Sequence, residues 1–171
     1  MAPDEHPSPS SAHLGVWPGP TEWQKAAAHL FREAFEGRPD DQPYTWFVQE
    51  KEGIFDALNS VDAEGASERP DHRSPTIAAH AYHLLYILRG ANVFQGRPAP
   101  EGDWASTWAV QEVSPAEWRR LKERILEEYL LLAPFLETAP TDVENGVIGL
   151  LAQLPHVAYH LGAMRALLRV V

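Results

Sequence analysis

The sequence predicts an all-α protein, folded as a four-helix bundle. Apolar residues recur at helical spacing in four long segments, and helix-start signals precede them. Nowhere do apolar and polar residues alternate for long enough to predict a strand. The 171 residues, of which 44% are hydrophobic and 22% charged, are typical of one globular domain with its own core.

The first long helix is predicted to begin at Thr21, and we take residues 21–171 as the folded domain. Residues 1–20 are rich in proline and serine, which favours an N-terminal tail. Thr21 and Gln24 have the spacing of a capping box, and Gly37 is a typical helix end. The apolar stripe of this helix contains Trp23, Ala27, Leu30 and Ala34.

The segment between the first and second long helices has the least regular pattern. Residues 45–58 suggest a helix interrupted near Gly53, and residues 62–67 suggest one short helical turn. The pair Ser74-Pro75 then predicts the start of the second long helix, with the serine as its N-cap. We expect that helix to continue to about Gln95.

The third long helix is predicted to begin at Ser114. Ser114 and Glu117 have capping-box spacing, and Pro115 occupies the first helical position. On the outer side of the helix, Arg124 and Glu128 are spaced as an i,i+4 ion pair. Its buried face is predicted to contain Trp118, Leu121, Ile125, Leu132 and Leu136.

The last long helix is predicted to start at a cap formed by Thr141 or Asp142 and to run to the C-terminus. Two prolines interrupt the helical pattern of the second half of the chain. Pro134 should bend or end the third helix in its last turns, and Pro155 should kink the fourth.

Charge and composition exclude several classes of function. The formal net charge of −10 opposes binding to the phosphate backbone of a nucleic acid or to an anionic membrane. The chain has no cysteine, so it has no disulfide, and any metal must be bound by His, Asp or Glu. No signal peptide is visible, and no run approaches the roughly 18 apolar residues of a membrane span. We therefore expect a cytoplasmic protein.

Two histidines, His156 and His160, are four residues apart in the last predicted helix. This spacing places both imidazoles on one face, with β-carbons about 5–6 Å apart. Small and apolar residues share the face and leave room around the rings: Gly149, Ala152, Ala163 and Leu167. Paired helical imidazoles bind zinc in some proteases, but two hydrogen-bonded core histidines would give the same pattern.

A third histidine, His83, lies in the apolar stripe of the second long helix. Burial of an imidazole costs free energy unless the ring has a partner, so inward-facing histidines on two helices favour a metal site in the core. Three neutral imidazoles suit zinc, nickel or iron and leave a coordination position for water or a small-molecule substrate. His80 is an extra ligand, a hydrogen-bond partner of a ligand or a surface residue, and we favour the last two.

Residues 76–84 and 156–162 resemble two segments of the DinB/YfiT-like family of metal-dependent enzymes. The resemblance covers most of the chain from about Thr21 onward. TIAAHAYHL at 76–84 is similar to the family's stretch that ends in His-Leu, which implies His83 rather than His80 as the first ligand. HVAYHLG at 156–162 resembles the family's HxxYHxG segment, which implies that both of its histidines are ligands.

The resemblance implies an up-down-down-up order of helices, one divalent ion (nickel, zinc or iron) and often a homodimer. Characterised relatives include S-transferases and isomerases with a low-molecular-weight thiol as cofactor. A metal would lower the pKa of such a thiol, and the absence of cysteine fits a nucleophile supplied from outside. Ala163 stands where many members have glutamine, a departure that bears on what the pocket recognises.

Two other functions stay open on the sequence. A metal-dependent hydrolase would use the same three ligands with a carboxylate or a further histidine near the ion. A non-enzymatic, stress-related metal-binding protein would hold a structural ion, normally closed by a fourth protein ligand.

Six residues are candidates for the wall of a substrate pocket, although each also has a plainer explanation. The aromatic residues would contact a substrate or fill the core, and the arginines would meet an anionic substrate or pair with surface carboxylates. They are Trp46, Tyr82, Trp108, Tyr159, Arg89 and Arg165. No carboxylate occupies a convincing general-base position, so no catalytic residue is assigned.

Overall fold

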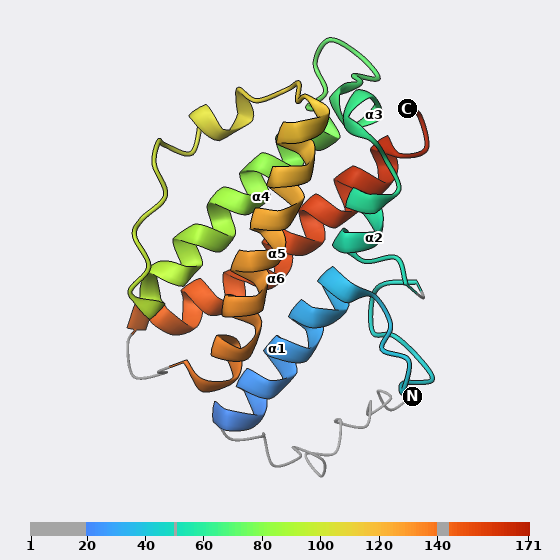
Figure 1. The fold of residues 1–171 in the computed structure, drawn as a ribbon. Coiled ribbons are helices and arrows are strands. Elements are labelled where there is room, and N and C mark those ends of the chain that lie inside the picture. The colour runs from blue at the N-terminus through green and yellow to red at the C-terminus, as the bar shows by residue number, and fades with distance from the viewer. Residues whose placement is uncertain (1–19, 50, 140–143) are drawn as a thin grey trace, which may run out of the picture.

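The computed structural model describes residues 20–49, 51–139 and 144–171, and every regular element within these ranges is a helix. Four long helices pack around one core (Figure 1): α1 (Pro20–Glu36), α4 (Ile77–Asn92), α5 (Pro115–Thr138) and α6 (Glu144–Leu167). The connections contain the short helices α2 (Ile54–Asn59) and α3 (Ala63–Ser67) and the 3-10 turns η1 (Val93–Gln95) and η2 (Ser106–Trp108). The predicted all-α class is confirmed.

The directions of the long helices place α4 beside α6. Figure 1 shows α1 and α6 running one way and α4 and α5 running the other way. Because α4 and α5 share a direction, residues 93–114 must return from the end of α4 to the start of α5, and they do so along the outside of the molecule. α4 and α1 each pack against both α5 and α6. The second and last long helices therefore meet in the core.

Two of the long helices, α4 and α5, begin at capping residues, and the cap of α4 lies two positions later than predicted. α1 begins at Pro20, so Thr21, its predicted start, already lies within the helix. Thr76, not Ser74, is the N-cap of α4. Its hydroxyl accepts the backbone N–H of Ala79, three residues later, at 3.1 Å. Ser74 is held in a turn instead, because its N–H and hydroxyl both donate to Asp71. The predicted capping box of α5 is confirmed, with reciprocal hydrogen bonds between Ser114 and Glu117.

The helix predicted over residues 45–58 is wrong in its first part, since only α2 is helical. The buried carboxylate of Glu33 accepts three consecutive backbone N–H groups, at residues 46–48, and so holds this stretch out of helical hydrogen bonding. The chain then passes the end of α1 at Gly53, where a β-carbon would lie 2.4 Å from the carbonyl oxygen of Phe35. The short helix predicted at residues 62–67 is confirmed as α3.

The face of α5 predicted to be buried is confirmed, but the predicted ion pair on its outer side is wrong. Glu128 is itself buried, on the side of α5 that faces the end of α4. Its carboxylate accepts from Asn92 at 2.6 Å and lies 3.7 Å from Arg89 Nε and 3.8 Å from Arg97. Its partners are therefore at the end of α4 and in the connection that follows, rather than at Arg124. The confirmed core residues are Trp118, Leu121, Ile125, Leu132 and Leu136.

α6 is apolar over most of its surface. The segment Gly146–Leu167 is long and apolar enough to cross a membrane by length and composition, which corrects the expectation that no segment is. Only 28% of its apolar window is buried, and Ile148, Leu151 and Tyr159 are exposed. The helix packs against α1 and α4, and its His160 is buried in the core.

The two prolines do not end their helices. α5 continues past Pro134 to Thr138, and α6 continues past Pro155 to Leu167. The predicted cap of the last helix, at Thr141 or Asp142, lies outside the described residues, as does the predicted tail apart from Pro20, which begins α1.

Candidate metal centre

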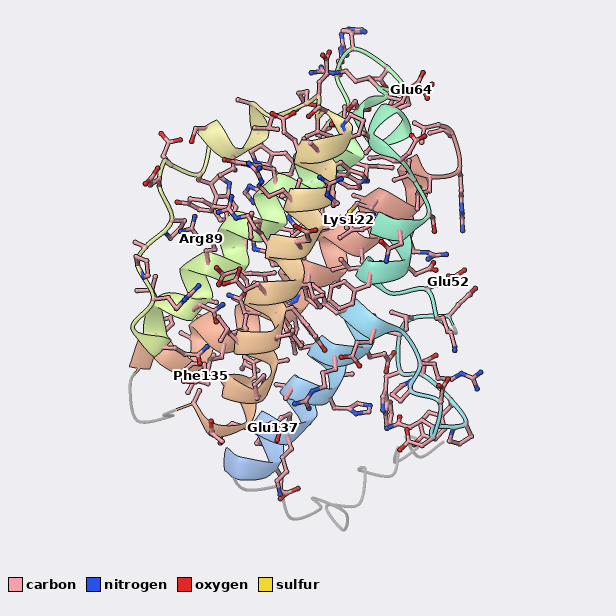
Figure 2. The ribbon with its side chains drawn as sticks, in the orientation of Figure 1. Glu52, Glu64, Arg89, Lys122, Phe135 and Glu137 are labelled. Atoms are coloured by element: carbon pink, nitrogen blue, oxygen red, sulfur yellow. The ribbon has the colours of Figure 1, made fainter. Side chains whose placement is uncertain are left out.

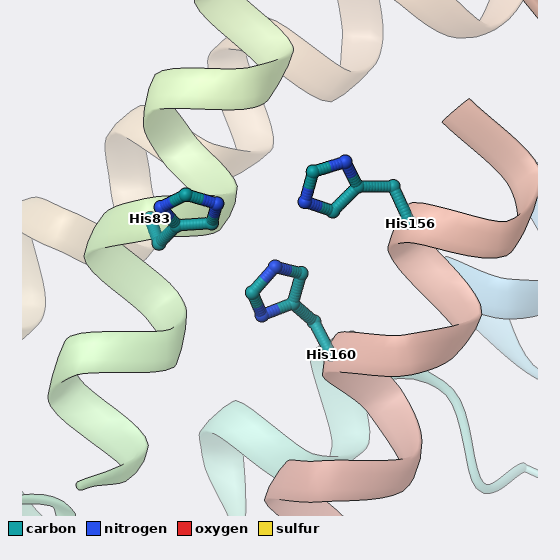
Figure 3. Close-up of side chains that lie close together, drawn as sticks. All are labelled: His83, His156 and His160. Carbon is teal, nitrogen blue, oxygen red and sulfur yellow. The ribbon is translucent and has the colours of Figure 1, made fainter. Parts of the chain in front are cut away.

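Three histidines from two helices converge between α4 and α6. Figure 3 shows the rings of His83, from α4, and of His156 and His160, from α6, directed toward one another. One ring nitrogen of each lies within 4.8 Å of those of the other two. His83 and His160 are fully buried and His156 is half-buried. The structure thus brings together the three residues that the sequence pattern selected.

The spacing of the rings follows from the helices that carry them. His156 and His160 stack almost parallel, with centroids 5.1 Å apart and planes 9° apart, as expected for an i,i+4 pair. The ring of His83 lies 5.5 Å from the first and 5.1 Å from the second. Within the described part of the chain the group contains histidines only, so an ion bound here would have three neutral protein ligands.

Two nitrogens of the group are buried without a hydrogen-bond partner: Nε2 of His83 and Nε2 of His160. Nδ1 of His83 lies 2.6 Å from the hydroxyl oxygen of Thr107. This hydroxyl donates its own hydrogen to the carbonyl of Trp104 at 2.7 Å, so it accepts the Nδ1 proton of His83. Nε2 of His83 is then left with a free lone pair, which is the arrangement that metal ligation requires.

His80 lies behind His160. The Nδ1 atoms of the two rings are 3.1 Å apart, so one ring donates and the other accepts. When His160 donates, its Nε2 keeps a lone pair on the side of the triad. Of the three roles considered for His80, this geometry fits that of a hydrogen-bond partner of a ligand. The ring is buried, so His80 is not a surface residue.

Burial keeps all four imidazoles neutral near pH 7. It lowers the pKa of His80 to about 4 and that of His160 to about 3. Burial also lowers the pKa of His83 to about 4, with a smaller contribution from the neighbouring His156 and His80. The pKa of His156 shifts in the same direction for the same main reason. Because the neutral imidazole is the form that binds a metal, the site needs no deprotonation step at this pH.

Aromatic rings surround the triad. Trp108 stacks on His83, with centroids 4.3 Å apart and planes 21° apart, and Tyr159 meets His160 edge-on at 5.1 Å. Trp104 also contacts His83 edge-on, at 4.5 Å. Both tryptophans belong to the connection between α4 and α5, which therefore covers one side of the site.

The aromatic pocket candidates divide into two groups. Trp108 and Tyr159 lie at the triad, as described above. Trp46 is in the connection after α1, where it lines a separate hollow of about 550 Å³ together with His29. Tyr82 lines another hollow, beside the start of α5. The structure therefore does not place Trp46 or Tyr82 at the candidate site.

Neither arginine candidate is available to an anionic substrate at the triad. Arg89 lies beside the buried Glu128, and Arg165 pairs with Glu52 and lies 3.7 Å from Asp56. Figure 2 shows Arg89 and Glu52 on opposite sides of the molecule. These pairs agree with the plainer explanation considered for both arginines, which is pairing with carboxylates.

Sequence reasoning missed two residues of the site, Thr107 and Trp104. Both lie in a polar connection without the periodicity that reveals a helix face. Trp104, Thr107 and Trp108 are spaced as i, i+3 and i+4, as in one helical turn, and η2 contains the last two. This spacing could have indicated the turn from the sequence, but it does not indicate which helix the turn packs against.

Fold and site together define an all-helical protein with a candidate three-histidine centre for a divalent metal. Comparison of the chain with family models, with curated proteins and with solved structures finds no match.

Proposed function

We propose that the chain is a metal-dependent enzyme of the DinB/YfiT-like type, with one zinc, nickel or iron ion held by His83, His156 and His160. The observation that carries this proposal is the pair of buried Nε2 atoms without partners, on His83 and His160. Buried polar atoms normally have a hydrogen-bond partner, and two that face a third histidine are the pattern of a metal site. The directions of α1, α4, α5 and α6 agree with the up-down-down-up order that the resemblance implies.

The ligand set supports an open site rather than a structural ion. A structural zinc normally has four protein ligands, and the described residues supply three. The nearest further histidine, His80, directs its Nδ1 to His160. A coordination position therefore remains for a small molecule.

Among the enzymatic functions, we propose transfer or isomerisation with a low-molecular-weight thiol ahead of hydrolysis. When bound, the ion would lower the pKa of a thiol at its open position. The described ligand group contains no carboxylate to act as a general base on water, and the chain has no cysteine to act as the nucleophile itself. The residues of the chain would hold the ion and, through Trp108 and Tyr159, restrict access of water to it.

We further propose a cytoplasmic homodimer that acts on a small molecule and binds neither nucleic acid nor membrane. The net charge of −10 supports the exclusion of nucleic acid. The exposed apolar side chains of α6, at Ile148, Leu151 and Tyr159, offer a surface that a second copy would cover. Light scattering at two protein concentrations measures the oligomeric state directly.

The metal content of untagged protein tests the central proposal. Mass spectrometry should find about one equivalent of metal in the wild type, and none in His83→Ala and His160→Ala, with the helical circular dichroism retained. His72→Ala, on an exposed connection, is the matched control and should keep its metal. Wild-type protein that carries no metal and takes up none from zinc, nickel or iron would refute the proposal. Thiol-transferase assays of the loaded protein then separate transfer from hydrolysis.

A further inference from the structure

Trp104 is an exposed tryptophan in direct contact with two of the candidate ligands. Its ring lies 4.5 Å from that of His83 and 5.2 Å from that of His156, yet 53% of the residue is accessible to solvent. Single exposed apolar residues are common on protein surfaces and need no explanation by themselves. What distinguishes this one is that part of its indole contacts the candidate metal centre while the rest is free.

Hydrogen bonds fix the position of Trp104 relative to the triad. Its carbonyl accepts from the hydroxyl of Thr107, which in turn accepts from His83. The turn is closed by the carboxylate of Asp103, which accepts the backbone N–H of Ser106 at 2.7 Å. These bonds hold the backbone of Trp104, and contacts with His83 and His156 hold one side of its indole. The indole would therefore lose little further conformational entropy when a ligand packs on its exposed side.

The positive charge of a bound ion determines which part of a ligand would coordinate it. Three neutral imidazoles leave both positive charges of a divalent ion uncompensated, and burial of net charge is costly without a counter-charge. Among the acidic residues of the adjoining turn, Asp103 uses its carboxylate on Ser106. The missing negative charge would therefore come from the ligand.

We infer that the site takes an organic anion whose charged head binds the ion and whose flat, apolar body stacks on the exposed face of Trp104. This inference rests on the proposed metal site and adds the chemical class of the substrate and the residue that selects it. Trp104 is a specificity-determining residue under this assignment, whereas Trp108, which is less exposed, supports the ring of His83.

A pair of probes with the same head and different bodies tests the inference. Benzohydroxamate and acetohydroxamate share a metal-binding anionic head, and only the first has a ring. Binding of each to cobalt-loaded protein is followed in the visible spectrum of the ion, with the metal content measured after each titration. We expect benzohydroxamate to bind about tenfold more tightly, which is in the range of one aromatic stacking contact.

Two tryptophan variants show whether that preference comes from Trp104. Trp104→Ala removes the stacking surface, so the ratio of the two affinities should fall to about one. The metal content and the affinity for acetohydroxamate are measured in the same titrations, so that a change in the site itself is recorded separately. Trp46→Ala removes another exposed tryptophan, which is away from the triad, and should keep the preference.

The outcomes separate the two proposals. Equal binding of the two hydroxamates by the wild type, or a preference that survives in Trp104→Ala, overturns the inference while the loaded metal still supports the metal site. Failure of the wild type to load cobalt, zinc, nickel or iron overturns the metal site and the inference with it.

Discussion

The hydroxyl oxygen of Thr107 lies 2.6 Å from Nδ1 of His83 and joins the connection between α4 and α5 to a candidate ligand on α4. Because the hydroxyl gives its hydrogen to the carbonyl of Trp104, it accepts the proton of Nδ1 and determines which nitrogen of His83 is free. The connection therefore sets the tautomer and orientation of this ring, which are properties that α4 alone leaves undetermined.

Replacement of Thr107 by valine should weaken metal binding without loss of the fold. Valine has nearly the same shape but cannot accept from Nδ1, and loss of such a partner typically costs about 10–100-fold in metal affinity. Competition with a chromophoric chelator measures the change. Thr107→Ser keeps the hydroxyl and should bind within a few-fold of the wild type; equal affinities of the valine and serine variants would contradict the assigned role.

Replacement of His80 by phenylalanine should reduce the affinity for metal but not the stoichiometry. The ring is buried and its Nδ1 lies 3.1 Å from that of His160, so phenylalanine fills the space and removes the hydrogen bond. We expect about one equivalent of metal at saturation, with affinity lowered about tenfold. Complete loss of metal, as expected for His160→Ala, would instead identify His80 as a ligand.

Acid should destabilise the metal-free protein from about pH 6.5 downward. Folding lowers the pKa of His83 to about 4 and that of His160 to about 3 from the ordinary value of 6.5. The unfolded chain then binds more protons in this interval, so stability that is fully present above pH 6.5 is lost as the pH falls toward 4. The loss is up to about 1.4 kcal/mol per pH unit for each histidine.

Urea unfolding at about pH 7.5, 6.5 and 5.5 measures this dependence above the range in which most carboxylates titrate. His83→Gln is the matched variant, because glutamine does not titrate, and it should show a smaller decrease between the upper and lower pH. A free energy of unfolding that is the same at the highest and the lowest of these pH values would show that the histidines are not buried in the neutral form.

Replacement of Glu33 by alanine should destabilise the fold by about 2–4 kcal/mol, because three backbone N–H groups lose a charged acceptor. The carboxylate lies 2.8 Å from the nitrogen of Trp46, 2.7 Å from that of Phe47 and 3.1 Å from that of Val48. Glu33→Gln keeps an acceptor oxygen and should cost less. Urea unfolding measures both, and the metal content should stay unchanged because Trp46 is away from the triad. An alanine variant as stable as the wild type would be inconsistent with the contact.

The long helices could be predicted because their signals are local. The capping box at Ser114 and Glu117 lies within one turn, and the buried stripe of α5 repeats at helical spacing. Residues 46–48 could not be predicted in the same way, since Glu33, which accepts their backbone N–H groups, is more than ten residues earlier in another element. Ser74 differs for a local reason: its N–H and hydroxyl donate to Asp71, three residues earlier, and Thr76 supplies the capping hydroxyl instead.

The histidines of the candidate site could be predicted because helical periodicity already places each of them on an inward face. His156 and His160 share a face through their spacing, and His83 occupies an apolar stripe. Their meeting depends on α4 lying beside α6, which periodicity does not determine. It was inferred because inward-facing histidines on two helices need a partner in the core, and the resemblance implied the same three ligands. Thr107 and Trp104 reach the triad from an irregular connection, where no periodicity relates sequence to direction.

Two of the three candidate ligands, His156 and His160, lie one turn apart on α6, and the third arrives only when α4 packs against that helix. An ion would therefore find a two-nitrogen chelate as soon as this turn of helix forms, before the core is complete. Docking of His83 would then be an intramolecular step at high effective concentration. A bound ion would thus link two segments that are far apart in the chain. Adding the metal during refolding should therefore change the rate at which the core forms.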